Sequence, residues 1–274
     1  MTDRYAVFGN PIGHSKSPRI HAAFAEQTAQ SLRYDAIEAP EADFAGAWQA
    51  FVEAGGRGAN VTVPFKQDAY SLTQVLSPRA QLAGAVNTLM VGRDGKTYGD
   101  TTDGVGLVRD LQAHAAPLKD ARVLLLGAGG ASRGVIEPLL EAGVSSLTVA
   151  NRTVAKAEEL ALLFAAKGEV SGCGFDAVEG PFDLVINATS ASLAGDLPPL
   201  PDETFAAEGL AYDMMYAAEP TVFLRWAAEH GARTVDGLGM LIEQAAESFW
   251  LWRQVRPDTG PLRESLRREL SQRN

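Results

Sequence analysis

Apolar runs and amphipathic segments alternate along the first hundred residues of the chain. Runs rich in Val, Leu and Tyr predict strands at 4–8, 32–38, 58–63 and 85–91. Segments with apolar residues at helical spacing predict helices at 17–29, 42–54 and 66–76. This alternation of strands and helices indicates an α/β domain.

The same rhythm restarts in the second half, with the apolar run Arg122-Val-Leu-Leu-Leu-Gly127. Further strands are predicted at 146–150, 183–187 and 210–214. Helices are predicted near 131–142, 153–166 and 219–230. We therefore expect a doubly wound parallel sheet here, with the join between the two halves near residues 101–118.

The last part of the chain predicts two helices. Residues 239–257 carry Leu241, Ile242 and Phe249 among polar residues, which is the pattern of an amphipathic helix. A charged helix is expected to follow at 260–271.

Composition favours a globular protein over a nucleic-acid or membrane protein. The 274 residues are 46% hydrophobic, which is enough to fill a substantial core. The net charge of −10 disfavours nucleic acid or an anionic membrane as a partner, so an anionic ligand needs a local positive site. Cys173 is the single cysteine, which excludes an internal disulfide and favours a cytoplasmic location. No apolar run is long enough to span a bilayer, and the first residues do not form a signal-peptide pattern.

A glycine loop follows the apolar strand that ends at Leu126. Its residues are Gly127, Ala128, Gly129, Gly130, Ala131 and Ser132, and a helical pattern follows them. Gly127 permits a tight turn, and Gly129 lets backbone N–H groups approach a pyrophosphate at the helix N-terminus. Ser132 stands where this fingerprint usually has its third glycine. The strand-loop-helix context favours dinucleotide binding over an ordinary glycine-rich turn.

The end of the next predicted strand bears on which dinucleotide binds. NAD-binding folds commonly place a carboxylate there against the ribose 2′-hydroxyl, whereas this chain has Asn151, Arg152 and Thr153. With Lys156 one helical turn later, these groups could surround a 2′-phosphate. Taken alone, Arg152 and Lys156 would be better explained as the solvated start of a helix. Together with the glycine loop, they favour NADP over NAD.

Polar side chains also gather at the predicted strand ends of the first half. They are Ser15, Ser17, Thr62, Lys66, Asn87 and Asp103. Because ligands bind at the carboxyl edge of open α/β sheets, these hydroxyl, amide, ammonium and carboxylate groups could converge on a polyhydroxylated acid. Each has a simpler interpretation when taken singly, as a helix cap, a turn residue or a surface charge.

The motifs resemble the shikimate dehydrogenase family over nearly the whole chain. They are G-N-P-I-G-H-S-K-S-P at 9–18, N-V-T-V-P-F-K at 60–66, G-A-V-N-T at 84–88, T-D-G at 102–104, G-A-G-G-A-S at 127–132, N-R-T at 151–153, N-A-T-S at 187–190, Y-D-M-M-Y at 212–216 and D-G-L-G-M-L at 236–241. The resemblance implies two α/β domains. We expect a substrate domain at 1–103, completed by C-terminal helices at 239–274, and a Rossmann-type NADP domain at 104–238.

The resemblance also implies roles for individual residues. Ser15, Ser17 and Tyr216 would hold the substrate carboxylate, while Thr62, Lys66, Asn87, Asp103 and Gln244 would address the ring hydroxyls and the ketone. The cofactor would contact residues 127–132, Asn151, Arg152, Thr153 and Lys156, and near the nicotinamide Thr189, Met214, Gly237 and Met240. The Ser15-x-Ser17 pattern looks like the shikimate-selective form of the family.

Reduction of the ketone by hydride requires a proton donor as the alkoxide forms. Lys66 is the candidate acid and Asp103 its partner, because an ammonium can stabilise the developing charge and donate a proton. His14 is the competing candidate, although placing the serine loop is the better interpretation of that residue. We expect no metal, because the Cys, His and carboxylate residues lack convincing ligand spacing.

Two alternatives remain open at this stage. A quinate/shikimate dehydrogenase of broader specificity would need few substitutions, and a ligand-sensing relative could keep the fold without catalysis. The presence of both Lys66 and Asp103 argues against the second alternative. The sequence leaves monomer and homodimer equally open.

Overall fold

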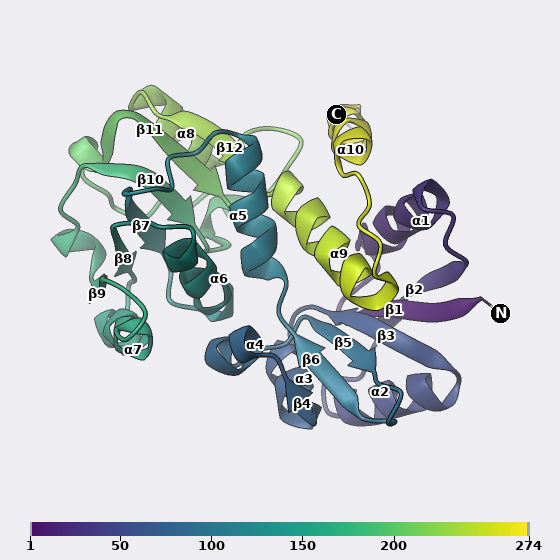
Figure 1. Cartoon of the computed structure of the whole chain (residues 1–274). Helices are drawn as coiled ribbons and strands as arrows, with labels where there is room; N and C mark the ends of the chain where they lie inside the picture. The colour runs from purple at the N-terminus through teal and green to yellow at the C-terminus, as the bar shows by residue number, and fades with distance from the viewer. Residues whose placement is uncertain (1, 273–274) are drawn as a thin grey trace. The chain divides into compact units, whose positions relative to one another are not determined.

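The computed structural model describes residues 2–272, which form two compact units (Figure 1). The first unit comprises the described residues up to Asp103 together with Ile242–Leu262. The second comprises Gly104–Leu241 together with the described residues from Arg263 onward. Residues 1, 273 and 274, which fall within the predicted domain bounds, lie outside the described residues.

The sheet of the first unit has the strand order β2-β1-β3-β5-β6-β4. Its strands are β1 (Asp3–Gly9), β2 (Leu32–Glu38), β3 (Gly56–Val61), β4 (Val75–Leu76), β5 (Thr88–Val91) and β6 (Thr97–Asp100). Strands β1, β2 and β3 are parallel, whereas β5 runs antiparallel to both β3 and β6. The helices are α1 (Ser17–Gln27), α2 (Phe44–Glu53), α3 (Lys66–Leu72) and α4 (Pro78–Ala83).

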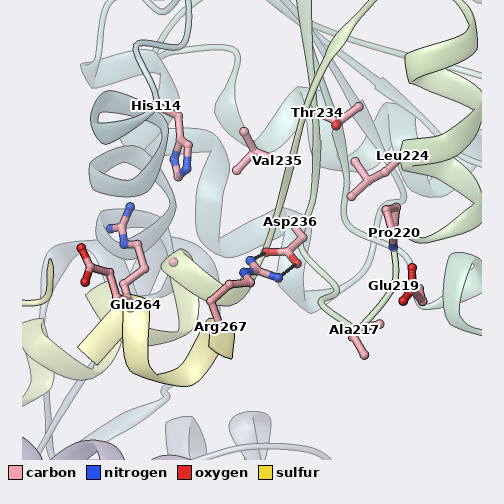
Figure 2. A pocket seen from close by; sticks show the side chains of 13 residues that line it. His114, Ala217, Glu219, Pro220, Leu224, Thr234, Val235, Asp236, Glu264 and Arg267 are labelled. Carbon is pink, nitrogen blue, oxygen red and sulfur yellow. Dashed lines mark hydrogen bonds and ion pairs between the residues drawn. The ribbon is translucent and has the colours of Figure 1, made fainter. Parts of the chain in front are cut away.

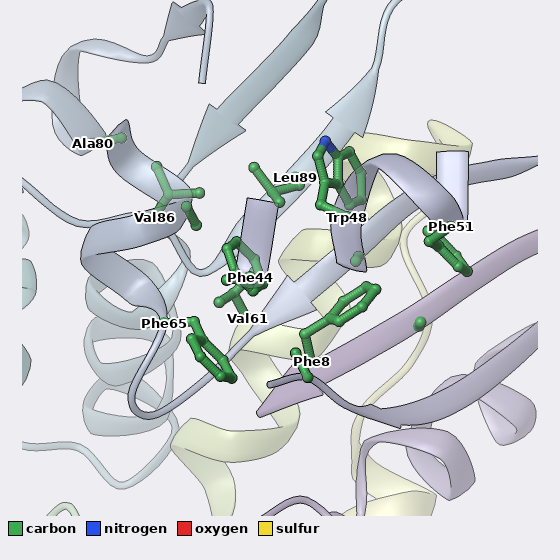
Figure 3. Close-up of a cluster of buried hydrophobic side chains, with 13 residues drawn as sticks. Phe8, Phe44, Trp48, Phe51, Val61, Phe65, Ala80, Val86 and Leu89 are labelled. Atoms are coloured by element: carbon green, nitrogen blue, oxygen red, sulfur yellow. The ribbon is translucent and has the colours of Figure 1, made fainter. Parts of the chain in front are cut away.

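Strand β1 places side chains in cores on both faces of this sheet. Ala6 and Phe8 lie in the cluster of Figure 3, where Phe8 meets Phe44 and Phe51 edge-on. Tyr5 and Val7 belong to a second cluster. This alternation follows from the two-residue period of a strand, and the part of β1 from Tyr5 to Phe8 is apolar and buried on both sides. Asn87 lies beside the end of β3, where its carbonyl accepts the Val61 N–H at 2.7 Å, and the Lys66 carbonyl accepts the Val86 N–H at 3.0 Å.

The sheet of the second unit has the strand order β12-β11-β10-β7-β8-β9, and its neighbouring strands all pair in parallel. The strands are β7 (Arg122–Leu126), β8 (Ser146–Ala150), β9 (Val170–Cys173), β10 (Phe182–Asn187), β11 (Phe205–Asp213) and β12 (Arg233–Asp236). The order reverses between β7 and β10, which is the topology of a Rossmann fold. The doubly wound parallel sheet expected for this half is therefore present.

The helices of this unit are α5 (Asp103–Ala113), α6 (Gly130–Glu141), α7 (Val154–Phe164) and α8 (Val222–Glu229). Short 3-10 turns occur at Phe175–Ala177, Ala191–Leu193 and Asp202–Thr204. The run Val123–Leu126 is fully buried, as expected for a central strand covered by helices on both faces.

Two further helices end the chain, α9 (Leu238–Arg253) and α10 (Gly260–Ser271). Most of α9 belongs to the first unit, but α10 from Arg263 onward belongs to the second. Arg263 lies 2.9 Å from the Asp110 carboxylate, and Arg267 forms a bidentate ion pair with Asp236. These ion pairs give a physical reason why the final helix does not follow α9 into the first unit. Within residues 2–272, no helix is both long and apolar enough to cross a membrane.

Candidate active site

The first residues of α3 and α5 form an ion pair in the first unit. The Lys66 ammonium donates to Oδ2 of Asp103 at 2.6 Å. The Lys66 side chain is 33% exposed and that of Asp103 is 18% exposed, so the pair is partly shielded but open to a ligand. An ammonium held in this way can both stabilise negative charge and donate a proton.

Asn87 holds the second carboxylate oxygen of Asp103. Its amide Nδ2 donates to Oδ1 of Asp103 at 2.9 Å and to the Thr102 hydroxyl at 3.0 Å. Its Oδ1 accepts the Thr102 backbone N–H at 2.9 Å. The side-chain amide oxygen of Gln244, Oε1, lies 3.4 Å from the same Nδ2. The structure therefore brings together four predicted substrate residues, Lys66, Asn87, Asp103 and Gln244.

Asn87 is also held by a buried polar cluster of Asn60, Thr88 and Ser248, which sequence reasoning did not single out. Nδ2 of Asn60 donates to the Ser248 hydroxyl at 2.9 Å and lies 3.2 Å from the Thr88 hydroxyl. Thr88 in turn donates to Oδ1 of Asn87 at 2.8 Å. Asn60 and Thr102 belong to motifs of the family. Ser248 belongs to none of them, and nothing in the sequence around it indicates that it hydrogen-bonds to Asn60. These neutral groups fix the orientation of the Asn87 amide.

The serine loop lies before α1 in the same unit. The Ser17 backbone N–H donates to the Ser15 hydroxyl at 3.2 Å, and Ser17 is buried at the helix start. Thr62 closes a turn in which its carbonyl accepts the Phe65 N–H at 3.0 Å, immediately before Lys66. His14 is exposed. Of the predicted substrate residues, Tyr216 alone belongs to the second unit among the described residues.

The glycine loop lies between β7 and α6, as predicted. Gly127 has a φ of +101°, a left-handed conformation that favours glycine. Ser132 is fully buried and donates its hydroxyl to the Gly127 carbonyl at 2.6 Å, so this serine closes the loop in place of the usual glycine. A Cβ built on Gly129 or Gly130 would meet no atom of the described residues within 4 Å. The backbone N–H groups at the start of α6 are therefore accessible to an anion.

Exposed cationic and hydroxyl groups follow β8. Arg152, Thr153 and Lys156 are exposed around the N-terminus of α7. The Asn151 amide donates to the Thr153 carbonyl at 2.9 Å, which shapes this turn. The glycine loop is hydrogen-bonded to the end of β8, because the Gly127 N–H donates to the Ala150 carbonyl at 2.8 Å. This arrangement fits a dinucleotide whose ribose carries a 2′-phosphate.

The remaining predicted cofactor residues follow β10, β11 and β12 at the same carboxyl edge. A Cβ on Gly127 would lie 2.8 Å from the Thr189 methyl group, so Thr189 borders the glycine loop. Gly237 packs closely on Met214, because a Cβ there would lie 2.1 Å from the Met214 carbonyl oxygen. Met240 lies in the first turn of α9. Burial, aided by the Asp236 charge, raises the pKa of the Tyr216 phenol, which therefore stays protonated as a hydrogen-bond donor.

A pocket of about 440 Å³ in the second unit is separate from these residues. It is lined by Ala217–Pro220, His114, Leu224, Thr234–Asp236, Gly239, Arg263, Glu264 and Arg267. Figure 2 shows the Arg267 guanidinium hydrogen-bonded to the Asp236 carboxylate in the lining of this pocket. The pocket contains none of the predicted site residues. In residues 2–272, no group of three or more His, Cys, Asp and Glu side chains is placed to hold a metal ion.

Family models match three parts of the chain. Residues 7–89 match the shikimate dehydrogenase substrate binding domain, and 110–194 match the shikimate / quinate 5-dehydrogenase domain. Residues 237–267 match the shikimate 5′-dehydrogenase C-terminal domain. The first match covers the serine loop, Lys66 and Asn87, and the second covers the glycine loop.

Individual relatives match nearly the full length. The shikimate dehydrogenase (NADP(+)) of Chromohalobacter salexigens is 69% identical over 98% of this chain and 99% of its own. An Ael1 enzyme from Pseudomonas putida is 49% identical, with a TM-score of 0.91 over 97% of this chain and 98% of its own. A Thermus thermophilus shikimate 5-dehydrogenase in complex with NADP(H) and shikimate is 36% identical, with a TM-score of 0.85 over 98% of this chain and 100% of its own.

Proposed function

The chain belongs to the shikimate dehydrogenase family, and from this we propose that it catalyses the reversible NADPH-dependent reduction of 3-dehydroshikimate to shikimate. It is an oxidoreductase of the shikimate pathway, which leads to chorismate and the aromatic amino acids. The single observation that carries the chemistry is the 2.6 Å contact between the Lys66 ammonium and Asp103 at a partly exposed site.

Lys66 acts as the general acid in this proposal. When bound, NADPH would supply the hydride for the ketone carbon. The Lys66 Nζ stabilises the negative charge that develops on the ketone oxygen and gives it a proton. In the direction of alcohol oxidation the same nitrogen, once neutral, accepts that proton. Asp103 holds Lys66 in position, and Asn87 fixes Asp103 through its other carboxylate oxygen.

The substrate is held at its carboxylate by hydroxyl donors. Ser15 and Ser17 lie in one short turn, and burial raises the pKa of the Tyr216 phenol, so this donor stays protonated to a higher pH than an exposed phenol. Thr62 and Gln244 address the ring hydroxyls together with Asn87. Such a set of neutral donors suits a small polyhydroxylated acid.

The second unit offers the donor set that NADP requires. The open start of α6, formed by Gly127–Ser132, would hold the pyrophosphate, and Asn151, Arg152, Thr153 and Lys156 would hold the 2′-phosphate. Thr189, Met214, Gly237 and Met240 would border the nicotinamide. The absence of a carboxylate after β8 supports NADP over NAD.

We further propose that the enzyme works in the cytoplasm as a monomer or homodimer. The single cysteine is consistent with a reducing compartment, and Cys173 is partly buried. Size-exclusion chromatography with light scattering separates the two oligomeric states. A larger assembly would contradict the proposal.

Absorbance of NADPH provides the test of function. Shikimate and quinate are offered separately with NADP and with NAD at matched concentrations, and we expect strong turnover with shikimate and NADP alone. Comparable turnover with quinate would favour the broader-specificity enzyme, an alternative kept open by the match of 110–194 to a shikimate / quinate domain. No turnover by folded protein with any pair would refute a dehydrogenase.

Lys66→Ala tests the assignment of the acid. We expect kcat to fall by about 10²–10⁴-fold while the KM for NADPH stays close to that of the wild type. Lys96→Ala is the matched control, because Lys96 is an exposed lysine of the same unit whose ion-pair partner, Asp94, lies in the same turn. An unchanged kcat in the Lys66 variant would remove this residue from the chemistry.

A further inference from the structure

Asp213 is a fully buried carboxylate that the reaction above does not use. It ends β11 and faces Asn187 at the end of β10. Among the described residues its hydrogen-bond partners are all neutral groups. The Thr221 hydroxyl donates to Oδ2 at 2.6 Å, while the Met215 backbone N–H and the Asn187 amide donate to Oδ1 at 3.0 and 3.1 Å.

Burial of a carboxylate without a cation is costly, so its presence calls for a compensating role. Burial raises the pKa of Asp213, and these hydrogen bonds oppose that rise. An uncharged side chain at the end of β11 would avoid the desolvation cost altogether. The number of donors that converge on Asp213 indicates that a two-oxygen acceptor is needed at this point.

The contacts of Asp213 lead directly to the segments that would border the nicotinamide. Oδ1 of Asn187 accepts both the backbone N–H and the hydroxyl of Thr189, at 3.1 and 2.7 Å. On the other side, the Met215 N–H bonded to Asp213 fixes the turn that follows Met214. The Met215 carbonyl then accepts the Gly237 N–H at 3.1 Å. One carboxylate thus ties together the loops after β10, β11 and β12.

We propose that Asp213 is a positioning residue for the nicotinamide half of the cofactor, acting through Asn187 on Thr189 and through Met215 on Met214 and Gly237. This inference rests on the proposed cofactor roles of Thr189, Met214 and Gly237. Asp213 does not touch the cofactor in this proposal. It holds the binding loops in their binding conformation before the nicotinamide arrives, which lowers the ordering cost of binding.

Asp213→Asn tests the proposal. The amide has only one acceptor oxygen, so its NH₂ group replaces an oxygen that accepts a hydrogen bond in the wild type, and at least one donor to Asp213 loses its acceptor. Binding is measured by calorimetry with two probes, NADPH and 2′-phospho-ADP-ribose, which lacks the nicotinamide. We expect NADPH affinity to fall by about 5- to 150-fold and the affinity of the fragment to stay unchanged. Asp183→Asn is the control, since Asp183 lies at the opposite end of β10 and accepts the Arg122 N–H there.

The reciprocal variant Asn187→Asp/Asp213→Asn keeps the test decisive if the single variant folds poorly. Positions 187 and 213 then again hold one carboxylate and one amide, with their places exchanged. We therefore expect this variant to recover a large part of the NADPH affinity. Equal weakening of both probes would show a general effect on the unit and overturn the proposal, as would unchanged NADPH affinity or failure of the reciprocal variant to recover any affinity. Absence of NADPH binding by the wild type would instead refute the proposed function.

Discussion

His21 links the stability of the first unit to pH. The ring is fully buried and stacks on Tyr34 at 4.2 Å between centroids, with 7° between the planes. Its Nε2 donates to Oδ1 of Asn60 at 3.2 Å, while Nδ1 has no hydrogen-bond partner among the described residues. A second proton would therefore be buried without an acceptor. Burial lowers the pKa of His21 from 6.5 to about 3, and the hydrogen bond with Asn60 opposes this shift.

The sign and size of the effect follow from proton linkage. Between pH 6.5 and pH 3 the unfolded chain binds a proton at His21 that the folded chain does not bind, so the free energy of unfolding falls as pH falls. From pH 7 to pH 5 the loss attributable to His21 amounts to about 2 kcal/mol. His21→Phe preserves the aromatic stacking and removes the titration. Since Asn60 keeps its hydrogen bond from the Tyr34 hydroxyl, the substitution costs about 1 kcal/mol at pH 7.

Urea denaturation at pH 7 and pH 5, followed by tryptophan fluorescence, measures this difference. Trp48, Trp250 and Trp252 all lie in the first unit, so the signal reports mainly its unfolding. We expect the stability of His21→Phe to change less between the two pH values than that of the wild type, by about 2 kcal/mol. His14→Gln is the control, because it removes an exposed histidine of the same unit. Equal pH dependence of His21→Phe and wild type would refute the reasoning.

Three further substitutions test the two units separately. Asp103→Asn should lower kcat and raise the KM for shikimate about tenfold or more, because it weakens the hold on Lys66; steady-state kinetics with near-wild-type values for both would contradict this. Arg152→Ala should raise the KM for NADPH about tenfold and leave that for NADH unchanged, and an equal rise for both cofactors would show that this arginine does not read the 2′-phosphate. Gly237→Ala should lower Tm by several degrees, because its Cβ would lie 2.1 Å from the Met214 carbonyl oxygen; an unchanged melting curve would mean that the backbone yields freely there.

The sequence predicted the long periodic elements and missed the short ones. The helix expected at 66–76 ends at Leu72, because Thr73 turns to an extended conformation and β4 follows at Val75–Leu76. Those two apolar residues fit a helical period and a strand equally well, so the pattern could not separate the two. The change of unit between Asp103 and Gly104 falls within the join expected near 101–118, but the sequence did not predict the regular helix α5 there. Its buried face is formed by Leu107 and Leu111 with a carboxylate, Asp110, and this mixture weakened the apolar signal.

For the site, the sequence predicted the groups that face a ligand better than those that support them. Lys66 and Asp103 lie 37 residues apart yet were paired through their motifs, and the structure places them in contact. Ser248 lies 188 residues from Asn60, and no local pattern connects a serine on an apolar helix to that amide. Asp213 and Asn187 are in motifs but resemble ordinary strand-end polar residues until the sheet register sets them side by side. Supporting contacts of this kind depend on the tertiary fold, which short-range patterns do not encode.

The route of the chain from Ile242 onward has a consequence for how it folds during synthesis. The first unit is incomplete until Ile242–Leu262 has been synthesised, because Ser248 is part of its buried polar cluster. The second unit in turn waits for Arg263 and Arg267, the counterions of Asp110 and Asp236. The second unit therefore cannot be completed before the last segment of the first unit has been made, and neither unit is complete when Leu241 has been synthesised. Truncation of this C-terminal segment would damage both units at once.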